Sequence, residues 1–242
     1  MCGRFTQTRP WPDLVALYRI TEPVMAREPD RRYNIAPTDD IAVVRAVGPG
    51  GGRELTTLRW GLVPPWAKDP AQGARMINAR AETVAEKLAF CAALRARRCL
   101  VIADGFYEWQ AGVARTKQPL HIADPDRQPL AFAAVWERWR RPGAALLESC
   151  AIITTAASPV LSAIHDRMPA ILPAKDHDLW LDEATPVGRL GEVLRPYPGP
   201  LIAHAVTRRV NSVKYDDPGC MQSQPAARGV FTESSPPLCH TR

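Results

Sequence analysis

The chain has 242 residues, of which 46% are hydrophobic and 23% are charged, so it can fold into one large domain or two small ones. No apolar run approaches the roughly 20 residues that span a bilayer. The first residues, MCGRFTQTRPWPD, contain no apolar segment of the kind found in secretory signals. These features argue against a helical membrane protein and a secreted one, and we expect a cytoplasmic protein.

The charge balance is compatible with a polyanionic partner but does not by itself select one. The formal net charge is +6 and the sequence pI is about 9.2, values that nucleic-acid-binding proteins often have. The six cysteines contain no C-x-x-C pair, and the five histidines show no regular spacing with them. We therefore expect free thiols, no metal site and no cofactor.

In chain order, the hydrophobic pattern predicts more strands than helices. A first short helix is expected over 11–20, with Pro12 near its start. Strands are expected over 41–47 and 54–63, with the turn GPGGG between them, and a helix is expected over 85–98. Further strand-like runs cover 99–109, 118–124, 129–139 and 150–157. Short helices are expected over 159–165, 176–181 and 186–193, and a last strand pair over 201–206 and 208–213.

Many strands and few intervening helices favour an α+β fold. We predict a single domain over residues 1–220, with a largely antiparallel, barrel-like β core and short helices at its periphery. From residue 221 onward the composition becomes polar and rich in Pro and Ser. This composition predicts a disordered tail over 221–242.

The second residue is the first chemical signal. Met1 precedes a small residue, so its removal is expected, and the mature chain then begins at Cys2. A thiol two carbons from a free α-amine is a 1,2-aminothiol. Gly3 permits unusual backbone dihedrals beside this terminus, and Arg4 is able to hold an anion.

Two internal stretches carry further candidates. In MINARAE, Asn78 and Arg80 are two residues apart and share one side if the segment is a strand. In ADGFYEW, Glu108 stands between two aromatic residues. Desolvation there would raise its pKa and make it a usable acid or base. The alternatives are an Asn78 that caps a turn and a Glu108 that lies exposed at a rim.

The remaining candidates lie in IHDRMP and RWGLVPPWAKD. His165 and Arg167 follow a predicted short helix, although a single histidine is more often structural than catalytic. Aromatic residues beside rigid prolines are typical of platforms on which single-stranded bases stack. Trp60 is at least as well explained as a buried side chain that braces a turn, whereas Trp66 lies in a Pro-rich loop and is the better surface candidate.

An amino-terminal cysteine serves two classes of chemistry. In amino-terminal-nucleophile amidohydrolases the thiolate attacks an amide and the α-amine is its base. In the second class, an aldehyde condenses with the amine to an imine and the thiol closes a thiazolidine ring. The α-amine has a pKa of about 7.7–8.0, so a useful fraction is neutral in the cell.

Nine stretches, in a fixed order from Cys2 to Cys220, make the sequence resemble the SRAP family (SOS response-associated peptidase). Members of this family shield abasic sites by crosslinking to single-stranded DNA. The stretches are MCGRF, YNIAPT, RWGLVPPWAKD, MINARAET, RRCLVIADGFYEW, AFAAVWERW, AIITTAAS, IHDRMPAIL and RVNSVKYDDPGC. The resemblance implies the SRAP fold, an α+β domain with a barrel-like β centre.

The resemblance also implies a role for each matching residue. Cys2 would form the thiazolidine with the aldehyde, Asn78 would orient the amine and the sugar, and Glu108 would move the proton that opens the deoxyribose ring. His165 would assist this proton transfer. Phosphates beside the lesion would be held by Arg4, Arg80 and Arg167, and Trp66 would support or wedge a neighbouring base.

The partner implied by the resemblance is single-stranded DNA that contains an abasic site. A monomer that associates with the nucleoid when bound to DNA is expected. Abasic-site lyase activity and autoproteolytic peptidase activity are possible side reactions of the same residues. The amidohydrolase acting on glutamine or peptide amides stays open as the alternative.

Overall fold

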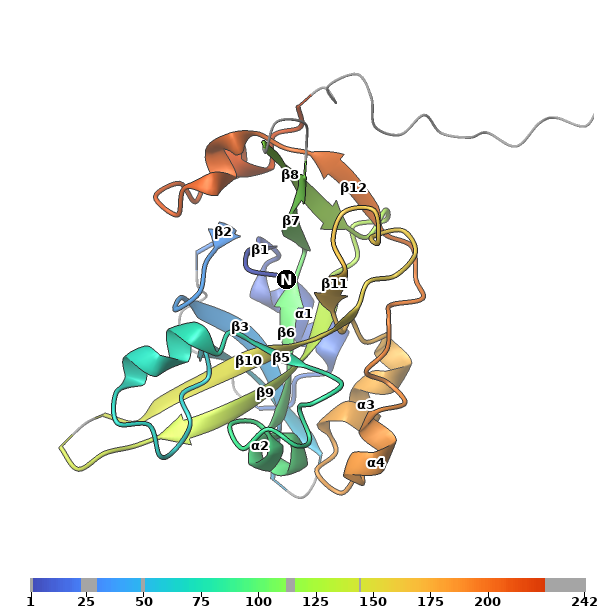
Figure 1. The fold of residues 1–242 in the computed structure, drawn as a ribbon. Helices are drawn as coiled ribbons and strands as arrows, with labels where there is room; N and C mark the ends of the chain where they lie inside the picture. The colour runs from blue at the N-terminus through green and yellow to red at the C-terminus, as the bar shows by residue number, and fades with distance from the viewer. Residues whose placement is uncertain (1, 23–29, 49–50, 112–115, 144, 225–242) are drawn as a thin grey trace, which may run out of the picture.

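The computed structural model describes residues 2–22, 30–48, 51–111, 116–143 and 145–224. Two β-sheets meet near the amino-terminal end of the chain, and short helices lie around them (Figure 1). None of the described helices has the length and apolar character needed to cross a bilayer. The expected α+β architecture is confirmed.

The first sheet closes into a five-stranded barrel. Its strands are β3 (Asp40–Val47), β4 (Gly52–Trp60), β6 (Arg98–Ala103), β9 (Leu130–Trp139) and β10 (Leu147–Ala156). The ring closes because β10 pairs with β9 on one side and with β4 on the other. The β10–β4 pair is parallel and the other pairs of the ring are antiparallel. The predicted barrel-like, largely antiparallel core is therefore confirmed.

Alternate residues of the barrel strands enter two separate apolar clusters. Val43 and Val101 pack with Phe5 and Phe106 of the second sheet, whereas their neighbours Val44 and Leu100 pack against the helical side of the molecule. A strand with apolar neighbours on both faces is buried throughout, as β6 is at all of its positions. The hydrophobic effect thus holds the barrel between the second sheet and the helices.

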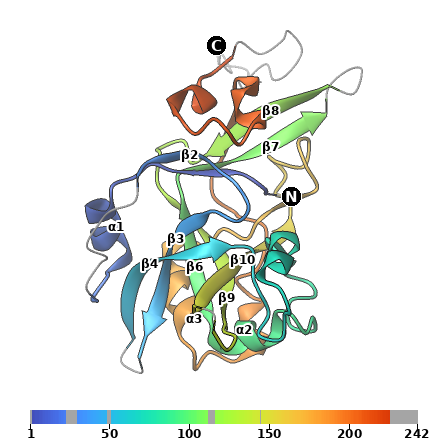
Figure 2. The same cartoon turned by 90° about the vertical axis from the view of Figure 1, so that its left-hand side faces the viewer.

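The second sheet is antiparallel and carries the amino-terminal strand in its interior. Its order is β12 (Ile202–Ala205), β8 (Lys117–Ala123), β7 (Gly105–Ala111), β1 (Phe5–Gln7) and β2 (Arg32–Ile35). The hairpin of β7 and β8 extends away from the barrel (Figure 2). The run 99–109, predicted as one strand, divides at Asp104 into β6 and β7, so this residue marks the passage from barrel to second sheet.

Short elements complete the fold. Two three-residue strands, β5 (Asn78–Arg80) and β11 (Arg167–Pro169), pair with β10. The helices are α1 (Trp11–Tyr18), α2 (Cys91–Ala96), α3 (His177–Leu181) and α4 (Val187–Leu190). The 3-10 turns are η1 (Pro70–Arg75), η3 (Ala174–Asp176), η4 (Arg208–Asn211) and η5 (Pro218–Met221).

Three further predicted elements differ from the structure. The helix expected over 85–98 is a series of turns followed by α2, and Leu88 on its apolar side is 79% exposed. Residues 159–164 form turns rather than a helix. The strand expected over 208–213 is wrong: residues 208–211 form η4, and Asn34 donates to the carbonyl of Val210 within it at 3.3 Å.

The predicted tail begins with four residues that contact the fold. Gln224 donates its backbone N–H to the carbonyl of Ala205 at 2.9 Å, and Ser223 bridges to Val206 beside β12. Residues 225–242 lie outside the described part of the chain, and the disorder predicted for them stays a prediction.

Candidate functional site

Strand pairing brings Cys2 beside Glu108. Phe5 of β1 faces Phe106 of β7, and the backbone N–H of Tyr107 donates to the carbonyl of Arg4 at 2.9 Å. Cys2 precedes β1 and is fully buried, with its thiol 3.8 Å from the carbonyl of Arg4. Burial first, and then the charge of Glu108, raise the pKa of the Cys2 thiol far above its ordinary value. The sulfur is therefore a neutral thiol at cellular pH.

Asn78 ties the amino-terminal segment to the barrel. Strand β5 runs parallel to β10, with Asn78 opposite Ile152, and the Asn78 Nδ2 donates to the carbonyl of Cys2 at 2.8 Å. Its Oδ1 is buried and has no hydrogen-bond partner among the described residues. An unpaired buried amide oxygen is costly unless a ligand supplies a donor, so Asn78 is well placed to bind one.

Glu108 is buried on β7, with only 4% of the residue exposed, which excludes the exposed-rim alternative. Burial raises the pKa of its carboxyl, and the positive charges of the amino terminus and of His165 oppose this increase. A carboxyl with a raised pKa holds its proton closer to neutrality and is suited to donate it and take it back. The desolvation that its aromatic neighbours predicted is confirmed.

His165 lies next to β11, which pairs with β10 so that Arg167 faces Ala156. The Nδ1 of His165 accepts the backbone N–H of Arg167 at 3.0 Å and lies 2.7 Å from Oδ1 of Asp166. The two contacts use the same ring nitrogen in different forms: a bare Nδ1 accepts the backbone N–H, and an Nδ1 that carries hydrogen donates to the carboxylate. His165 interacts electrostatically with Glu108, so it belongs to the same site.

The structure thus brings together all four residues predicted to be catalytic. Cys2 lies just before β1 and Glu108 lies on the neighbouring strand β7, whereas Asn78 and His165 are held by strands that pair with β10. The site lies where the barrel meets the second sheet, near the amino-terminal end of the chain (Figure 1).

The residues predicted to contact DNA fall into two groups. Arg80 and Trp66 are exposed and are accessible to a large ligand; 59% of the Trp66 surface is exposed. Trp60 is fully buried and donates its indole N–H to the carbonyl of Ile77 at 2.9 Å. The choice of Trp66 over Trp60 as the surface residue is confirmed, and Trp60 braces the segment that leads to Asn78.

The other two predicted contacts, Arg4 and Arg167, already have partners within the chain. Arg4 is half-buried, and its Nη1 donates to Oδ1 of Asn34 at 2.7 Å and to the carbonyl of Val210 at 2.8 Å. Burial lowers the pKa of its guanidinium. These bonds give Arg4 a structural role, the attachment of the segment around η4 to β2, which the sequence did not predict.

Arg167 is held by two residues that the sequence reasoning did not select. Its Nη1 and Nη2 donate to Oε1 and Oε2 of Glu82 at 2.6 and 2.9 Å, and Nη2 also donates to the carbonyl of Thr154 at 2.6 Å. The available signal for Glu82 was its position two residues after Arg80, on the same side of an extended segment.

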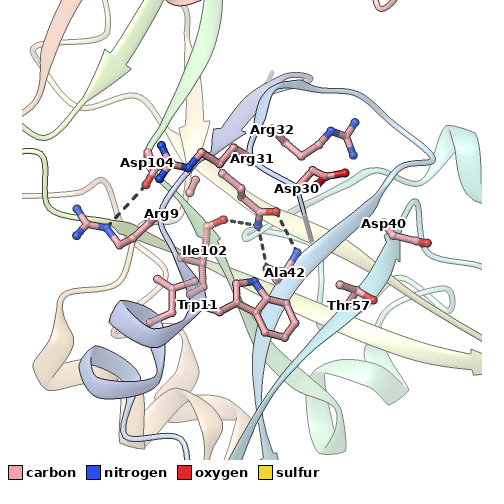
Figure 3. Close-up of a pocket in the computed structure, with 13 residues that line it drawn as sticks. Arg9, Trp11, Asp30, Arg31, Arg32, Asp40, Ala42, Thr57, Ile102 and Asp104 are labelled. Atoms are coloured by element: carbon pink, nitrogen blue, oxygen red, sulfur yellow. Dashed lines mark hydrogen bonds and ion pairs between the residues drawn. The ribbon is translucent and has the colours of Figure 1, made fainter. Parts of the chain in front are cut away.

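A separate cavity lies beside α1 and β3, away from these residues (Figure 3). Its volume is about 480 Å³, and none of the predicted catalytic residues lines it. Gln7 spans its wall, donating to the carbonyls of Ala42 and Ile102 at 3.0 and 2.5 Å. Arginines and aspartates alternate around it, so its charges largely cancel.

Comparison with known proteins identifies the family. Residues 1–213 match the sequence profile described as SOS response associated peptidase (SRAP). The chain belongs to the SRAP family. The SRAP chain is 39% identical over 225 residues to abasic site processing protein YoqW of Bacillus subtilis, with 92% of this chain and 100% of the relative covered.

A more distant relative and a solved structure are also similar to this chain. The abasic site processing protein HMCES of Gallus gallus is 36% identical over 194 residues, which cover 70% of this chain and 57% of the relative. A crystal structure of a protein from Bacteroides thetaiotaomicron superposes with a TM-score of 0.82 at 22% identity, covering 93% of this chain and all of that one. This last likeness shows that the fold is shared.

Proposed function

We propose that the protein processes abasic sites in single-stranded DNA by trapping the ring-opened aldehyde covalently at Cys2 after removal of Met1. The observation that carries this proposal is the convergence of Cys2, Asn78, Glu108 and His165 at one site in a member of a family whose named relatives are abasic site processing proteins. The protein acts as a monomer in the cytoplasm, at the nucleoid.

The first step is opening of the deoxyribose ring, since only the open form presents an aldehyde. Glu108 in its protonated form donates a proton to the ring oxygen, the bond from C1′ to that oxygen breaks, and the C1′ hydroxyl loses its proton to water as the aldehyde forms. The raised pKa that burial gives this carboxyl supports the role. His165, which interacts with Glu108, stabilises the charge that develops beside the sugar oxygen. The unpaired Oδ1 of Asn78 accepts a hydrogen bond from the attacking amine.

The second step is ring closure at C1′. The neutral α-amine adds to the aldehyde carbon, and loss of one water molecule leaves an imine. The Cys2 sulfur then adds to this carbon: a C–S bond forms and the π pair of the C=N bond moves to the nitrogen. Ionised Glu108 takes the thiol proton and passes it to that nitrogen. The product is a thiazolidine that seals the lesion. Without closure, β-elimination from the imine cuts the strand.

The electrostatics of Cys2 favour this chemistry over the amidohydrolase alternative. A nucleophilic cysteine attacks as the thiolate, and it is typically found where its pKa is lowered. Burial and Glu108 raise the pKa of Cys2 instead. In the proposed reaction the amine attacks first, and the thiol loses its proton only after the electrophilic imine has formed.

The DNA lies over exposed Arg80 and Trp66. The guanidinium binds a phosphate beside the lesion, and the indole supports a neighbouring base. Arg167 and Arg4 hold further phosphates in this proposal, Arg4 through donors other than the Nη1 that binds Asn34.

The decisive experiment incubates the purified protein with a single-stranded oligonucleotide that carries one abasic site. A denaturing gel and intact-mass spectrometry are then used to find an adduct. We expect an adduct on a chain that lacks Met1, and no adduct with the same DNA without the lesion. Cys2→Ala should abolish the stable adduct and leave amine-dependent cleavage. A Cys2→Ala variant that crosslinks as well as the wild type contradicts the proposal, and no adduct at all directs the search to glutamine and peptide amides.

A further inference from the structure

The guanidinium of Arg167 is occupied by a carboxylate in the bidentate manner that it would use for a phosphate. Its two terminal nitrogens donate to the two oxygens of Glu82 at 2.6 and 2.9 Å. A carboxylate and a phosphodiester each offer two oxygens and one negative charge to the planar fork of an arginine. Glu82 therefore occupies the position that a DNA phosphate would take on Arg167.

The arrangement leaves Glu82 on the solvent side of the pair. The Glu82 side chain is 52% exposed, whereas that of Arg167 is 14% exposed and is also held by the carbonyl of Thr154 at 2.6 Å. Because Arg167 is the more buried partner and is also held by Thr154, a competing anion would displace the more exposed Glu82 and leave the arginine in place.

Arg80 adds positive charge beside the pair of Arg167 and Glu82. It is exposed and lies two residues before Glu82, and its charge adds to that of Arg167 in lowering the pKa of the Glu82 carboxyl, after the hydrogen bond from Arg167. Glu82 is therefore ionised throughout the physiological range. A phosphate that replaces it receives the attraction of both arginines.

We propose that Glu82 is a specificity-determining residue that occupies the phosphate fork of Arg167 until a phosphodiester beside the lesion replaces it. This inference rests on the proposed function, because it assumes that DNA approaches Arg80 and Arg167. Other polyanions that contact the site only weakly bind less well because of Glu82. To bind Arg167, any ligand must first displace this internal carboxylate. A strand anchored at the lesion supplies its phosphate at high local concentration.

The test compares Glu82→Gln with a matched control. Glu192 beside α4 also faces an arginine, Arg189, at 3.9 Å, and its side chain is 63% exposed. Glu192→Gln therefore makes the same change of charge at an ion pair outside the site. The probe is a single-stranded oligonucleotide with one tetrahydrofuran residue, an abasic analogue without an aldehyde, and its equilibrium binding is measured by fluorescence anisotropy at several salt concentrations.

We expect Glu82→Gln to bind this probe about two- to fivefold more tightly than Glu192→Gln. We also expect a steeper salt dependence, by about 0.7 in the logarithmic slope, because the freed arginine now exchanges a counterion for the phosphate. In a chain that also carries Arg167→Gln, the Glu82→Gln change should give no gain beyond that of Glu192→Gln.

Weaker binding by Glu82→Gln, comparable to that of Arg167→Gln alone, would mean that Glu82 positions Arg167 for DNA and would overturn the inference. Binding equal to that of Glu192→Gln would overturn it as well. A wild-type protein that neither binds the analogue nor crosslinks abasic DNA would remove the proposed function itself, an outcome distinct from wild-type binding with an inert Glu82.

Discussion

Asn78 and Cys2 are joined by a hydrogen bond of 2.8 Å, from the side-chain Nδ2 to the backbone carbonyl, across 76 positions of the sequence. This bond fixes the backbone of the residue that carries the thiol, and it leaves the thiol itself unrestrained by Asn78. The other amide atom, Oδ1, is buried and has no partner among the residues described. One side chain thus both holds the amino-terminal segment and offers an acceptor to what binds there.

Replacing Asn78 by Ala removes both functions. We expect crosslinking to an abasic oligonucleotide to slow by about fivefold to tenfold, the effect of losing roughly one hydrogen bond of 1 kcal/mol or slightly more. Single-turnover gels measure the rate, and thermal unfolding measures the fold. A rate equal to that of the wild type, in a variant with an unchanged Tm, would show that the Asn78–Cys2 bond has no part in the reaction.

Replacing Glu108 by Gln keeps the shape of the side chain and removes its proton chemistry. We expect crosslinking to slow by about 100-fold or more, while binding of the tetrahydrofuran analogue changes by less than about threefold. Equal losses of binding and crosslinking would indicate misfolding instead of a chemical role.

The same Glu108→Gln change should also alter the reactivity of the Cys2 thiol. The charge of Glu108 helps to raise the pKa of the thiol, so its removal lowers that pKa, although burial keeps it above the ordinary value. Alkylation of Cys2 by iodoacetamide, followed by mass spectrometry, should be faster in the variant at pH 8. Unchanged alkylation would contradict the electrostatic contact between the two residues.

His121 makes the stability of the fold depend on pH. Its ring is 2% exposed and packs against Tyr107 and His204, and burial together with the charge of His204 lowers its pKa to about 3. The folded state therefore favours neutral His121, whose contribution is complete above the ordinary pKa near 6.5 and decreases as pH falls from there toward 3.

Between pH 7 and pH 5 the free energy of unfolding should decrease by about 2 kcal/mol on account of His121 alone. Urea denaturation at both pH values measures the change. His121→Phe retains an aromatic ring beside Tyr107 and should lose about this part of the pH dependence. An identical pH dependence in the variant would contradict the buried neutral state of His121.

Asn34 holds the segment that follows β12. Its Nδ2 donates to the carbonyls of Val210, Ser212 and Tyr215 at 3.3, 3.0 and 2.7 Å, and its Oδ1 accepts from Arg4. We expect Asn34→Ala to lower the free energy of unfolding by about 2–3 kcal/mol, because several buried groups lose their partner at once.

Asn34→Ala should also destabilise the segment over 208–216 locally, in addition to lowering the free energy of unfolding of the whole domain. Limited proteolysis should cut within 208–216 faster than in the wild type, whereas Asn211→Ala, which removes a single bond to the indole of Trp109, serves as the control. Cleavage at the same rate in both variants would contradict the role of Asn34.

Much of the site was predictable because its signals are local. Glu108 stands between aromatic residues within an apolar run, and such a carboxyl is desolvated wherever the strand packs. The neighbouring prolines likewise distinguished Trp66 from Trp60. The nearly continuous apolar runs around residues 41–47 and 130–139 were sufficient to predict a β core, since both faces of these strands carry apolar side chains.

The features that the sequence did not predict depend on contacts between residues far apart in the chain. Residues 208–213 were predicted to form a strand, but Asn34 binds the carbonyl of Val210 from 176 positions away and favours a 3-10 turn over a ladder. Arg167 was predicted to bind a phosphate. The sequence does not indicate that Glu82, 85 positions earlier, is its partner. Side-chain pairing across such distances follows from the closure of the barrel, which no local pattern encodes.

The pairing of β10 with β5 and β11 has a consequence for the order in which the site comes into being. Synthesis produces Cys2 first, whereas His165 and the strands that hold it and Asn78 in place are complete only when Pro169 has been added. Until then the thiol lacks the surroundings that bury it and raise its pKa. On a translating ribosome the thiol of the growing chain is therefore open to stray aldehydes and oxidants until β11 has been made.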